Sequence, residues 1–261
     1  MRVLGIDPAP SKDSVIFDGE CFIYKKAKNL QSYITELMER DEPLFIAWDA
    51  PLSAAIEREN FSLSIRKIES FFYRQSRSAK SLDEKRGIPH GISTLGYSSC
   101  PHWTISQHLF GYPVLNHEFI KELEWKLIMD NEREFGKYNL TEIHPALSMW
   151  ILLKDKLSKS ALFAKSWQYK GANTNEVKER LLILIKEIAQ LPLTHKYLKV
   201  KVDIKSDDEL DAFVCWLMGQ AFVSEDEKLM IYGDRLNGSF LLPKNEEIID
   251  KLDSFLMKHN I

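Results

Sequence analysis

Arg2-Val3-Leu4-Gly5-Ile6-Asp7-Pro8 is a short apolar run that stops at an aspartate followed by proline. Such a run is typical of a strand, and proline ends it because it lacks the N–H that a sheet ladder needs. A second apolar run, at residues 44–48, stops at Asp49 just before Ala50-Pro51. Its continuous apolar character is typical of a strand buried on both faces. We therefore expect two strands of an α/β sheet whose aspartate-bearing ends lie side by side.

The residues between these two strands predict a hairpin and a helix. Residues 14–18 and 21–25 read as strands, and Asp18-Gly19 between them is a strong turn signal. Residues 29–40 then place apolar side chains at helical spacing. The first 50 residues thus predict strand, hairpin, helix and strand in that order.

The remainder of the chain continues as an α/β pattern, and we expect one domain over residues 1–261. Residues 53–136 are mostly helical in pattern and predict a helical insertion or cap. Further strands are expected at 138–143, 228–232 and 239–242, and helices at 146–154, 176–190, from Ser206 to about 221, and at 245–258.

Composition excludes several classes of protein. Of 261 residues, 44% are hydrophobic and 28% charged, which is the balance of a globular protein with a core. The longest apolar run is far short of the roughly 18 residues that a membrane span needs, so no membrane association is expected. The net charge of −3 is unlike that of an avid nucleic-acid coat protein. Three scattered cysteines, Cys21, Cys100 and Cys215, predict a reducing, cytoplasmic environment and no disulfide framework.

Five acidic residues are the candidate chemistry: Asp7, Asp49, Glu142, Asp208 and Asp211. Three lie at or near the ends of apolar strands, and the last two lie three residues apart on one helix, hence on the same side of it. Crowded carboxylates repel one another unless a cation is present. Mg²⁺ or Mn²⁺ prefers oxygen ligands and would remove that repulsion.

Each of these residues also has an ordinary explanation. Asp7 and Asp49 precede prolines and suit turns, and Glu142 suits a surface strand edge. Asp208 suits the first turn of a helix, where negative charge complements the helix dipole. Asp211 is harder to explain in this way because it falls in the second turn, beside the apolar face. The combination of all five carries the hypothesis.

The ordered set of short motifs resembles a family of uncharacterised proteins classed as predicted nucleases with the ribonuclease H-like fold. The last motif is also similar to the closing motif of Holliday-junction resolvases. The motifs, in chain order, are Gly5-Ile6-Asp7-Pro8-Ala9, Ala47-Trp48-Asp49-Ala50-Pro51-Leu52, Glu142-Ile143-His144-Pro145-Ala146 and Asp208-Glu209-Leu210-Asp211-Ala212.

This resemblance implies a ribonuclease H-like mixed five-stranded sheet flanked by helices, with acidic residues at one edge. Asp7 would be the bridging metal ligand, Asp49 a second, and Asp208 and Asp211 the closing pair. Glu142 would join them as a catalytic residue. The implied reaction is hydrolysis of nucleic-acid phosphodiester bonds with two Mg²⁺ or Mn²⁺ ions.

Four further residues are candidates for binding substrate. Arg66 with Glu69 resembles the family's Arg-x-x-Asp/Glu helix, and His144 belongs to its Glu-x-His-Pro motif. Lys170, after Tyr169, and Arg180, before Leu181-Leu182, resemble its Lys…Arg-Leu segment.

Two basic stretches could contact phosphate groups. Residues 57–86 hold eight Lys or Arg against five acidic residues, and residues 154–201 hold eleven against four. Contacts of this kind are blind to sequence and sensitive to salt. Solvated helix faces explain the same stretches equally well.

Other functions fit less well or stay open. A sugar-kinase-like or actin-like protein needs a glycine-rich phosphate turn after its first strand, but Pro8-Ala9-Pro10 lacks the required amides. Cys100, His102 and His108 match no strong zinc pattern. A catalytically silent nucleic-acid-binding or protein-interaction module on the same scaffold remains the alternative to a nuclease.

Overall fold

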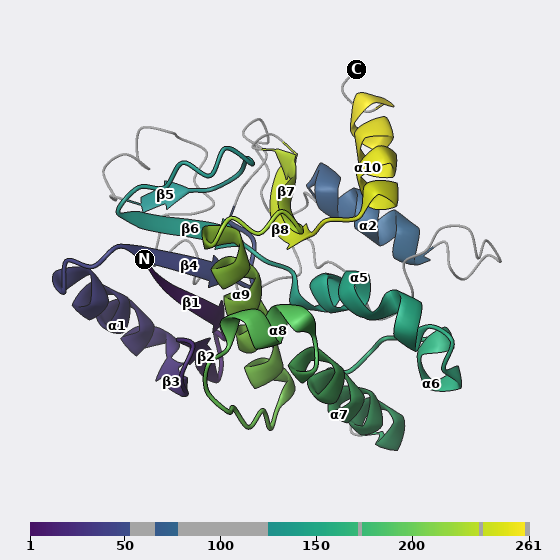
Figure 1. Ribbon diagram of the computed structural model, residues 1–261, viewed down its shortest axis with the longest axis horizontal. Coiled ribbons are helices and arrows are strands. Elements are labelled where there is room, and N and C mark those ends of the chain that lie inside the picture. The colour runs from purple at the N-terminus through teal and green to yellow at the C-terminus, as the bar shows by residue number, and fades with distance from the viewer. Residues whose placement is uncertain (53–65, 78–124, 172–173, 235–236, 259–261) are drawn as a thin grey trace.

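The computed structural model (Figure 1) describes residues 1–52, 66–77, 125–171, 174–234 and 237–258. Its strands are β1 (Arg2–Asp7), β2 (Asp13–Phe17), β3 (Phe22–Lys26), β4 (Leu44–Trp48), β5 (Trp125–Leu127), β6 (Tyr138–Glu142), β7 (Leu229–Asp234) and β8 (Gly238–Pro243). Its helices are α1 (Ala27–Glu39), α2 (Lys67–Arg77), α5 (Pro145–Leu157), α6 (Ala161–Ala164), α7 (Asn175–Ala189), α8 (Pro192–Tyr197), α9 (Asp207–Val223) and α10 (Glu246–Lys258).

A six-stranded mixed sheet, in the order β3-β2-β1-β4-β6-β5, forms the centre of this α/β fold. β2 runs antiparallel to β1 and β3, which confirms the predicted hairpin. β1, β4, β6 and β5 run parallel to one another. In the register, Ile6 pairs with Trp48, and Trp48 pairs with Glu142. The carboxyl ends of β1, β4 and β6 therefore meet at one edge of the sheet.

The sheet has six strands where five were predicted. The additional strand, β5, lies within residues 53–136, whose pattern predicts mainly helix. Three residues are too few to show an alternating pattern, and β5 is a strand because it pairs with β6. Trp125 also packs on Tyr138 with 5.7 Å between ring centroids. α2 is helical as expected, whereas residues 53–65 and 78–124 lie outside the described ranges, so the helical insertion stays a prediction.

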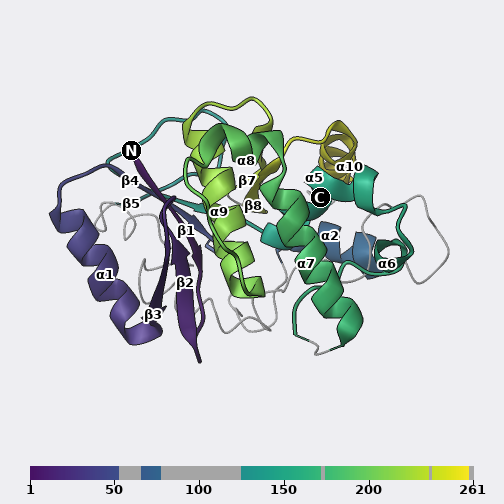
Figure 2. The ribbon, with the colours of Figure 1, turned by 60° about the horizontal axis from the view of Figure 1, so that its bottom comes forward.

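The two faces of the sheet pack against different helices, α1 on one side and α9 on the other (Figure 2). Leu4 and Ile6 belong to a core that contains Leu30 and Ile34 of α1. Val3 points the other way and belongs to the larger core around α9. Because both faces of β1 and β4 are buried, these strands are apolar at successive positions rather than alternating.

α9 lies directly against β1, with its backbone close to that of the strand. A Cβ atom placed on Gly5 would lie less than 3.0 Å from the carbonyl oxygen of Ala212 and the amide nitrogen of Trp216. Only glycine permits so close an approach of two backbones. Ser206 caps the helix by accepting a hydrogen bond from the amide of Glu209 at 3.1 Å. Gly5 therefore fixes how far the first turns of α9 lie from the end of β1.

The late strands β7 and β8 form a separate antiparallel hairpin. An isolated parallel bridge between Ile143 and Leu241 joins this hairpin to the end of β6. α2 packs against β8 and α10, so this part of the molecule abuts the carboxyl edge of the sheet. Within the ranges that the structure describes, no helix has the length and apolar character needed to cross a membrane.

We predict that Gly5→Ala destabilises the protein at the upper end of, or beyond, the roughly 1–3 kcal/mol that overpacking usually costs. The new methyl group would meet two backbone atoms that cannot rotate away. Chemical denaturation of both proteins measures the difference in the free energy of unfolding.

Gly219→Ala is the matched control because it adds the same group to the same interface. Its Cβ would lie 3.0 Å from the Cβ of Ala47 and 3.1 Å from Cγ1 of Val3, so a shift of a few tenths of an ångström relieves the contact, whereas the contacts at Gly5 are far shorter and involve backbone atoms. Equal losses in the two variants would contradict the importance of the β1–α9 backbone contact.

Candidate metal centre

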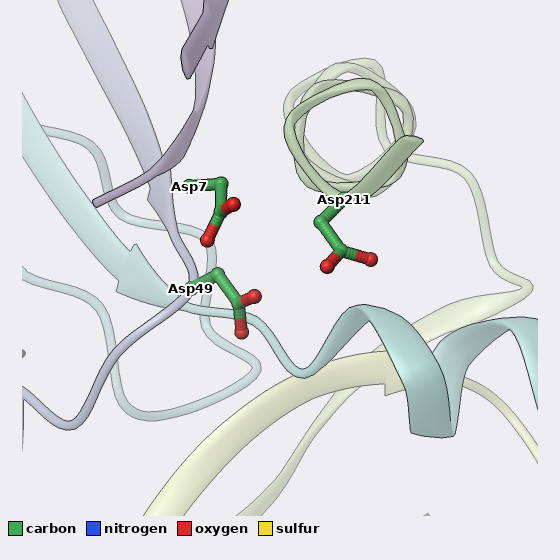
Figure 3. Close-up of side chains that lie close together, drawn as sticks. All are labelled: Asp7, Asp49 and Asp211. Carbon is green, nitrogen blue, oxygen red and sulfur yellow. The ribbon is translucent and has the colours of Figure 1, made fainter. Parts of the chain in front are cut away.

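Three carboxylates converge at the carboxyl edge of the sheet (Figure 3). Asp7 is the last residue of β1, Asp49 follows the last residue of β4, and Asp211 lies in the second turn of α9. One carboxylate oxygen from each lies within 4.8 Å of the others. We call these three residues the carboxylate triad. The predicted adjacency of the Asp7 and Asp49 strand ends is confirmed by the parallel pairing of β1 and β4.

The segment between α6 and α7 brings two consecutive side chains to Asp211. The hydroxyl of Tyr169 donates a hydrogen bond to Asp211 Oδ1 at 2.6 Å. The ammonium of Lys170 forms an ion pair with Asp211 Oδ2 and lies 3.7 Å from Asp49 Oδ2. The Lys170 side chain is 43% exposed, whereas Asp211 is fully buried. Lys170 thus reaches the triad from its solvent side.

Burial raises the pKa of every carboxyl group in the triad. For Asp7, desolvation is the largest cause, and the neighbouring carboxylates add to it. The pKa of Asp49 is raised to about 7 by desolvation and by Asp211, against the lowering effect of Lys170. Desolvation also raises the pKa of Asp211. One lysine therefore only partly offsets the burial and mutual repulsion of the three carboxyl groups, which makes the triad a candidate functional site.

The ammonium of Lys170 responds to the same field in the opposite direction. Desolvation lowers its pKa, but Asp211, Tyr169 and the other two carboxylates of the triad outweigh that effect. The pKa of Lys170 is consequently raised well above its usual value, and the side chain is held in its charged form.

The structure keeps Asp208 outside the triad, although the sequence placed it among the metal ligands. Asp208 lies in the first turn of α9, and its carboxylate pairs with the ammonium of Lys12. It is still close enough to raise the pKa of Asp7. The three-residue spacing predicts the side of the helix but does not distinguish the rim position of Asp208 from the buried position of Asp211.

Glu142 is likewise engaged elsewhere, in a buried network with Arg66. Two nitrogens of the Arg66 guanidinium donate to Glu142 at 2.7 and 2.5 Å, and one of them also donates to Glu69 at 2.7 Å. The amide of Leu52 donates to Glu142 at 2.9 Å. Burial raises the pKa of Glu142, and the contacts from Arg66 offset part of that shift. This network joins the end of β6 to the chain after β4 and to the start of α2.

Arg66, predicted to bind substrate, is 1% exposed, and its guanidinium faces these buried carboxylates. His144 caps α5: its Nδ1 accepts a hydrogen bond from the amide of Leu147 at 3.2 Å. Its ring also packs edge-on against Phe240. These contacts tie Arg66 to the network around Glu142 and tie His144 to the start of α5 and to β8.

Arg180 organises the segment that carries Lys170. From α7, its guanidinium donates to the carbonyl oxygens of Leu162 at 2.9 Å and Gln168 at 3.2 Å. The side-chain amide of Gln168 in turn donates to the carbonyl of Lys170 at 3.3 Å. Of the four predicted substrate-binding residues, Lys170 contacts the triad directly, and Arg180 positions the Lys170 segment through its backbone.

Sequence reasoning did not single out Tyr169 or Lys12 as contributors to the site. Tyr169 appeared there only as the neighbour of Lys170 in a motif, and no spacing rule relates either residue to Asp211 or Asp208. The separations along the chain, 42 residues for Tyr169–Asp211 and 196 for Lys12–Asp208, explain why. The possible zinc ligands Cys100, His102 and His108 lie outside the described residues.

The triad fits a hard divalent cation. All three ligands are carboxylate oxygens, which suit Mg²⁺ and Mn²⁺. Asp211 Oδ2 is fully buried, and the ammonium of Lys170 is its partner among the described residues. A buried carboxylate oxygen is costly without a cation beside it, and a divalent ion would supply positive charge to all three carboxylates, whereas Lys170 pairs with Asp211 and Asp49.

The fold and site thus define a mixed α/β protein with a cluster of buried carboxylates at the carboxyl edge of its sheet. Residues 119–236 match a family model described as a protein of unknown function (DUF429). The chain is therefore similar, over the region that contains Lys170 and Asp211, to an uncharacterised family. No curated protein matches the chain. No solved structure matches it either.

We predict that Glu142→Gln lowers the free energy of unfolding of the metal-free protein by about 3 kcal/mol, because it leaves a buried guanidinium partly uncompensated. Denaturation in the presence of a chelator measures this loss. Asp7→Asn is the comparison variant and should cause no loss, because it removes a buried charge that its neighbours repel. A similar loss of unfolding free energy in both variants would contradict the account, in which the Arg66–Glu142 network stabilises the fold and the carboxylates of the triad repel one another.

Proposed function

We propose that this protein is a ribonuclease H-like nuclease that hydrolyses phosphodiester bonds with Mg²⁺ or Mn²⁺. The observation that carries the proposal is the convergence of Asp7, Asp49 and Asp211 within 4.8 Å at the carboxyl ends of neighbouring parallel strands. The order β3-β2-β1-β4-β6, with an antiparallel first hairpin, supports the fold part of the proposal.

The triad would hold the cation through its three carboxylates. Bound there, Mg²⁺ or Mn²⁺ supplies Lewis-acid stabilisation of the charge that develops on phosphodiester oxygens. Tyr169 keeps Asp211 oriented, as hydrogen-bonded neighbours of metal ligands commonly do. A second ion, as a two-metal reaction requires, would need a further ligand, and Asp208 could supply it once released from Lys12.

Nucleic acid is the proposed substrate, and Lys12 is a suitable phosphate contact. Its side chain is 58% exposed and lies beside Asp208 at the rim of the site. Part of the positive charge in residues 154–201 is already neutralised within the protein. Lys156 pairs with Glu187, and Lys196 pairs with Asp226. Lys12 and Lys170 are also paired, but their partners Asp208 and Asp211 lie at the site, where a bound cation would release these lysines beside an incoming phosphate.

A catalytically silent nucleic-acid-binding or protein-interaction module is the second candidate. The observation in its favour is that Lys170 already supplies a positive charge to the triad from within the chain. A site in which Lys170 stays paired with Asp211 would keep its fold but would not catalyse the reaction.

We predict metal-dependent cleavage in an assay of the full chain against labelled DNA and RNA, single-stranded, double-stranded and branched. Asp7→Asn should reduce the rate by at least about 100-fold, the loss expected when several kcal/mol of metal-dependent stabilisation is removed. Asp226→Asn is the matched control, because Asp226 also contacts a lysine and a tyrosine but lies outside the triad. Cleavage that survives Asp7→Asn would contradict the proposal, and unaltered binding without cleavage by either protein would favour the module.

A further inference from the structure

Tyr169 and Lys170 divide the two oxygens of Asp211 between them. Tyr169 donates a hydrogen bond to Oδ1, and the ammonium of Lys170 pairs with Oδ2. The same ammonium lies 3.7 Å from Asp49 Oδ2, between two members of the triad. Among the described residues, the ammonium of Lys170 thus supplies the positive charge between the carboxylates of Asp49 and Asp211.

The surroundings of Lys170 allow it to leave this position. Its side chain is 43% exposed, so the ammonium can turn to solvent without crossing the core. The following residue, Gly171, has a φ of +78°, and an added Cβ there would meet nothing within 4 Å. Tyr169, in contrast, is 4% exposed and is fixed among core residues. The contact from Lys170 to Asp211 is therefore exchangeable, whereas the hydrogen bond from Tyr169 is a fixed part of the core.

We propose that Lys170 is an exchangeable internal cation: its ammonium occupies the Asp49–Asp211 side of the triad until a divalent cation displaces it, while Tyr169 holds Asp211 in place. This inference rests on the proposed metal-dependent function and concerns the loading of the same site. An ammonium and a divalent ion compete for the same carboxylate oxygens, so the lysine weakens the apparent affinity for metal. After displacement, its ammonium turns to the solvent side of the triad, where a phosphate would approach.

The proposal predicts opposite effects for two adjacent residues. Lys170→Met removes the competitor and keeps the apolar stem, so Mn²⁺ should bind at least about tenfold more tightly. Tyr169→Phe frees Asp211 Oδ1 from its hydrogen bond, so Mn²⁺ should bind about tenfold or more weakly. A purely structural role for this segment would weaken binding in both variants.

The chain provides a closely matched control at Asp226. There Lys196 and Tyr197, also consecutive in sequence, contact one aspartate at 2.9 and 3.1 Å. Asp226 is not a member of the triad, and hydrogen bonds from Lys196 and the amide of Lys228 lower its pKa despite the opposing effect of burial. Lys196→Met and Tyr197→Phe should leave the affinity for Mn²⁺ unchanged.

The experiment is a Mn²⁺ titration of the metal-free chain, residues 1–261, with free Mn²⁺ followed by electron paramagnetic resonance. Lys170→Arg, which keeps the charge, should stay close to the wild-type affinity, and Lys170→Gln repeats the test if the Met variant fails to fold. Thermal melting adds a second readout: without metal, Lys170→Met should melt below wild type, and Mn²⁺ should raise its melting temperature by more than it raises that of wild type.

The outcomes separate this inference from the proposed function. The exchange is supported if Mn²⁺ binds more tightly to Lys170→Met than to wild type and if this binding is lost in the double variant that also carries Asp7→Asn. If wild type binds Mn²⁺ and Lys170→Met binds it with equal or lower affinity, the exchange is wrong, whereas the metal site itself is supported. Binding confined to Lys170→Met supports the competition but argues against a working wild-type metalloenzyme. The absence of Mn²⁺ from both proteins overturns the exchange and the metal site together.

Discussion

The backbone contact between β1 and α9 is the constraint on which the site depends. Gly5 allows the helix to approach until the carbonyl of Ala212 and the amide of Trp216 are next to the strand. Asp211 immediately precedes Ala212, and Asp7 lies two residues beyond Gly5, so this contact brings their carboxylates together. The parallel pairing of β1 with β4 then adds Asp49. Three residues from distant parts of the chain thus converge because two backbones can touch.

The electrostatics around this edge separate into two clusters of different character. In one, Arg66 lies between Glu69 and Glu142, so a buried positive charge is shared by two carboxylates. In the other, three carboxylates share Lys170, and burial raises the pKa of each. The first cluster fixes the backbone after β4 and at the start of α2. In the second cluster, one lysine does not fully offset three carboxylates, and this is the physical reason to regard it as the functional site.

Much of this arrangement could be predicted from local sequence, because strand ends and helical spacing are local properties. Asp7 and Asp49 follow from apolar runs that stop before prolines, and Asp211 follows from its position beside the apolar face of its helix. The partners of these residues could not be predicted in the same way. The pairing of Glu142 with Arg66 spans 76 residues, and that of Asp208 with Lys12 spans 196. Such contacts depend on tertiary packing, as does β5, which is a strand only because β6 lies beside it.

The central claim is that the triad holds a divalent cation, and anomalous diffraction from a manganese-soaked crystal of the full chain tests it without any assumption about substrate. The account predicts a manganese peak among Asp7, Asp49 and Asp211, with Lys170 displaced from Asp211, and loss of the peak in Asp7→Asn. An ion elsewhere, or no ion at high manganese concentration with Lys170 still paired to Asp211, would contradict it.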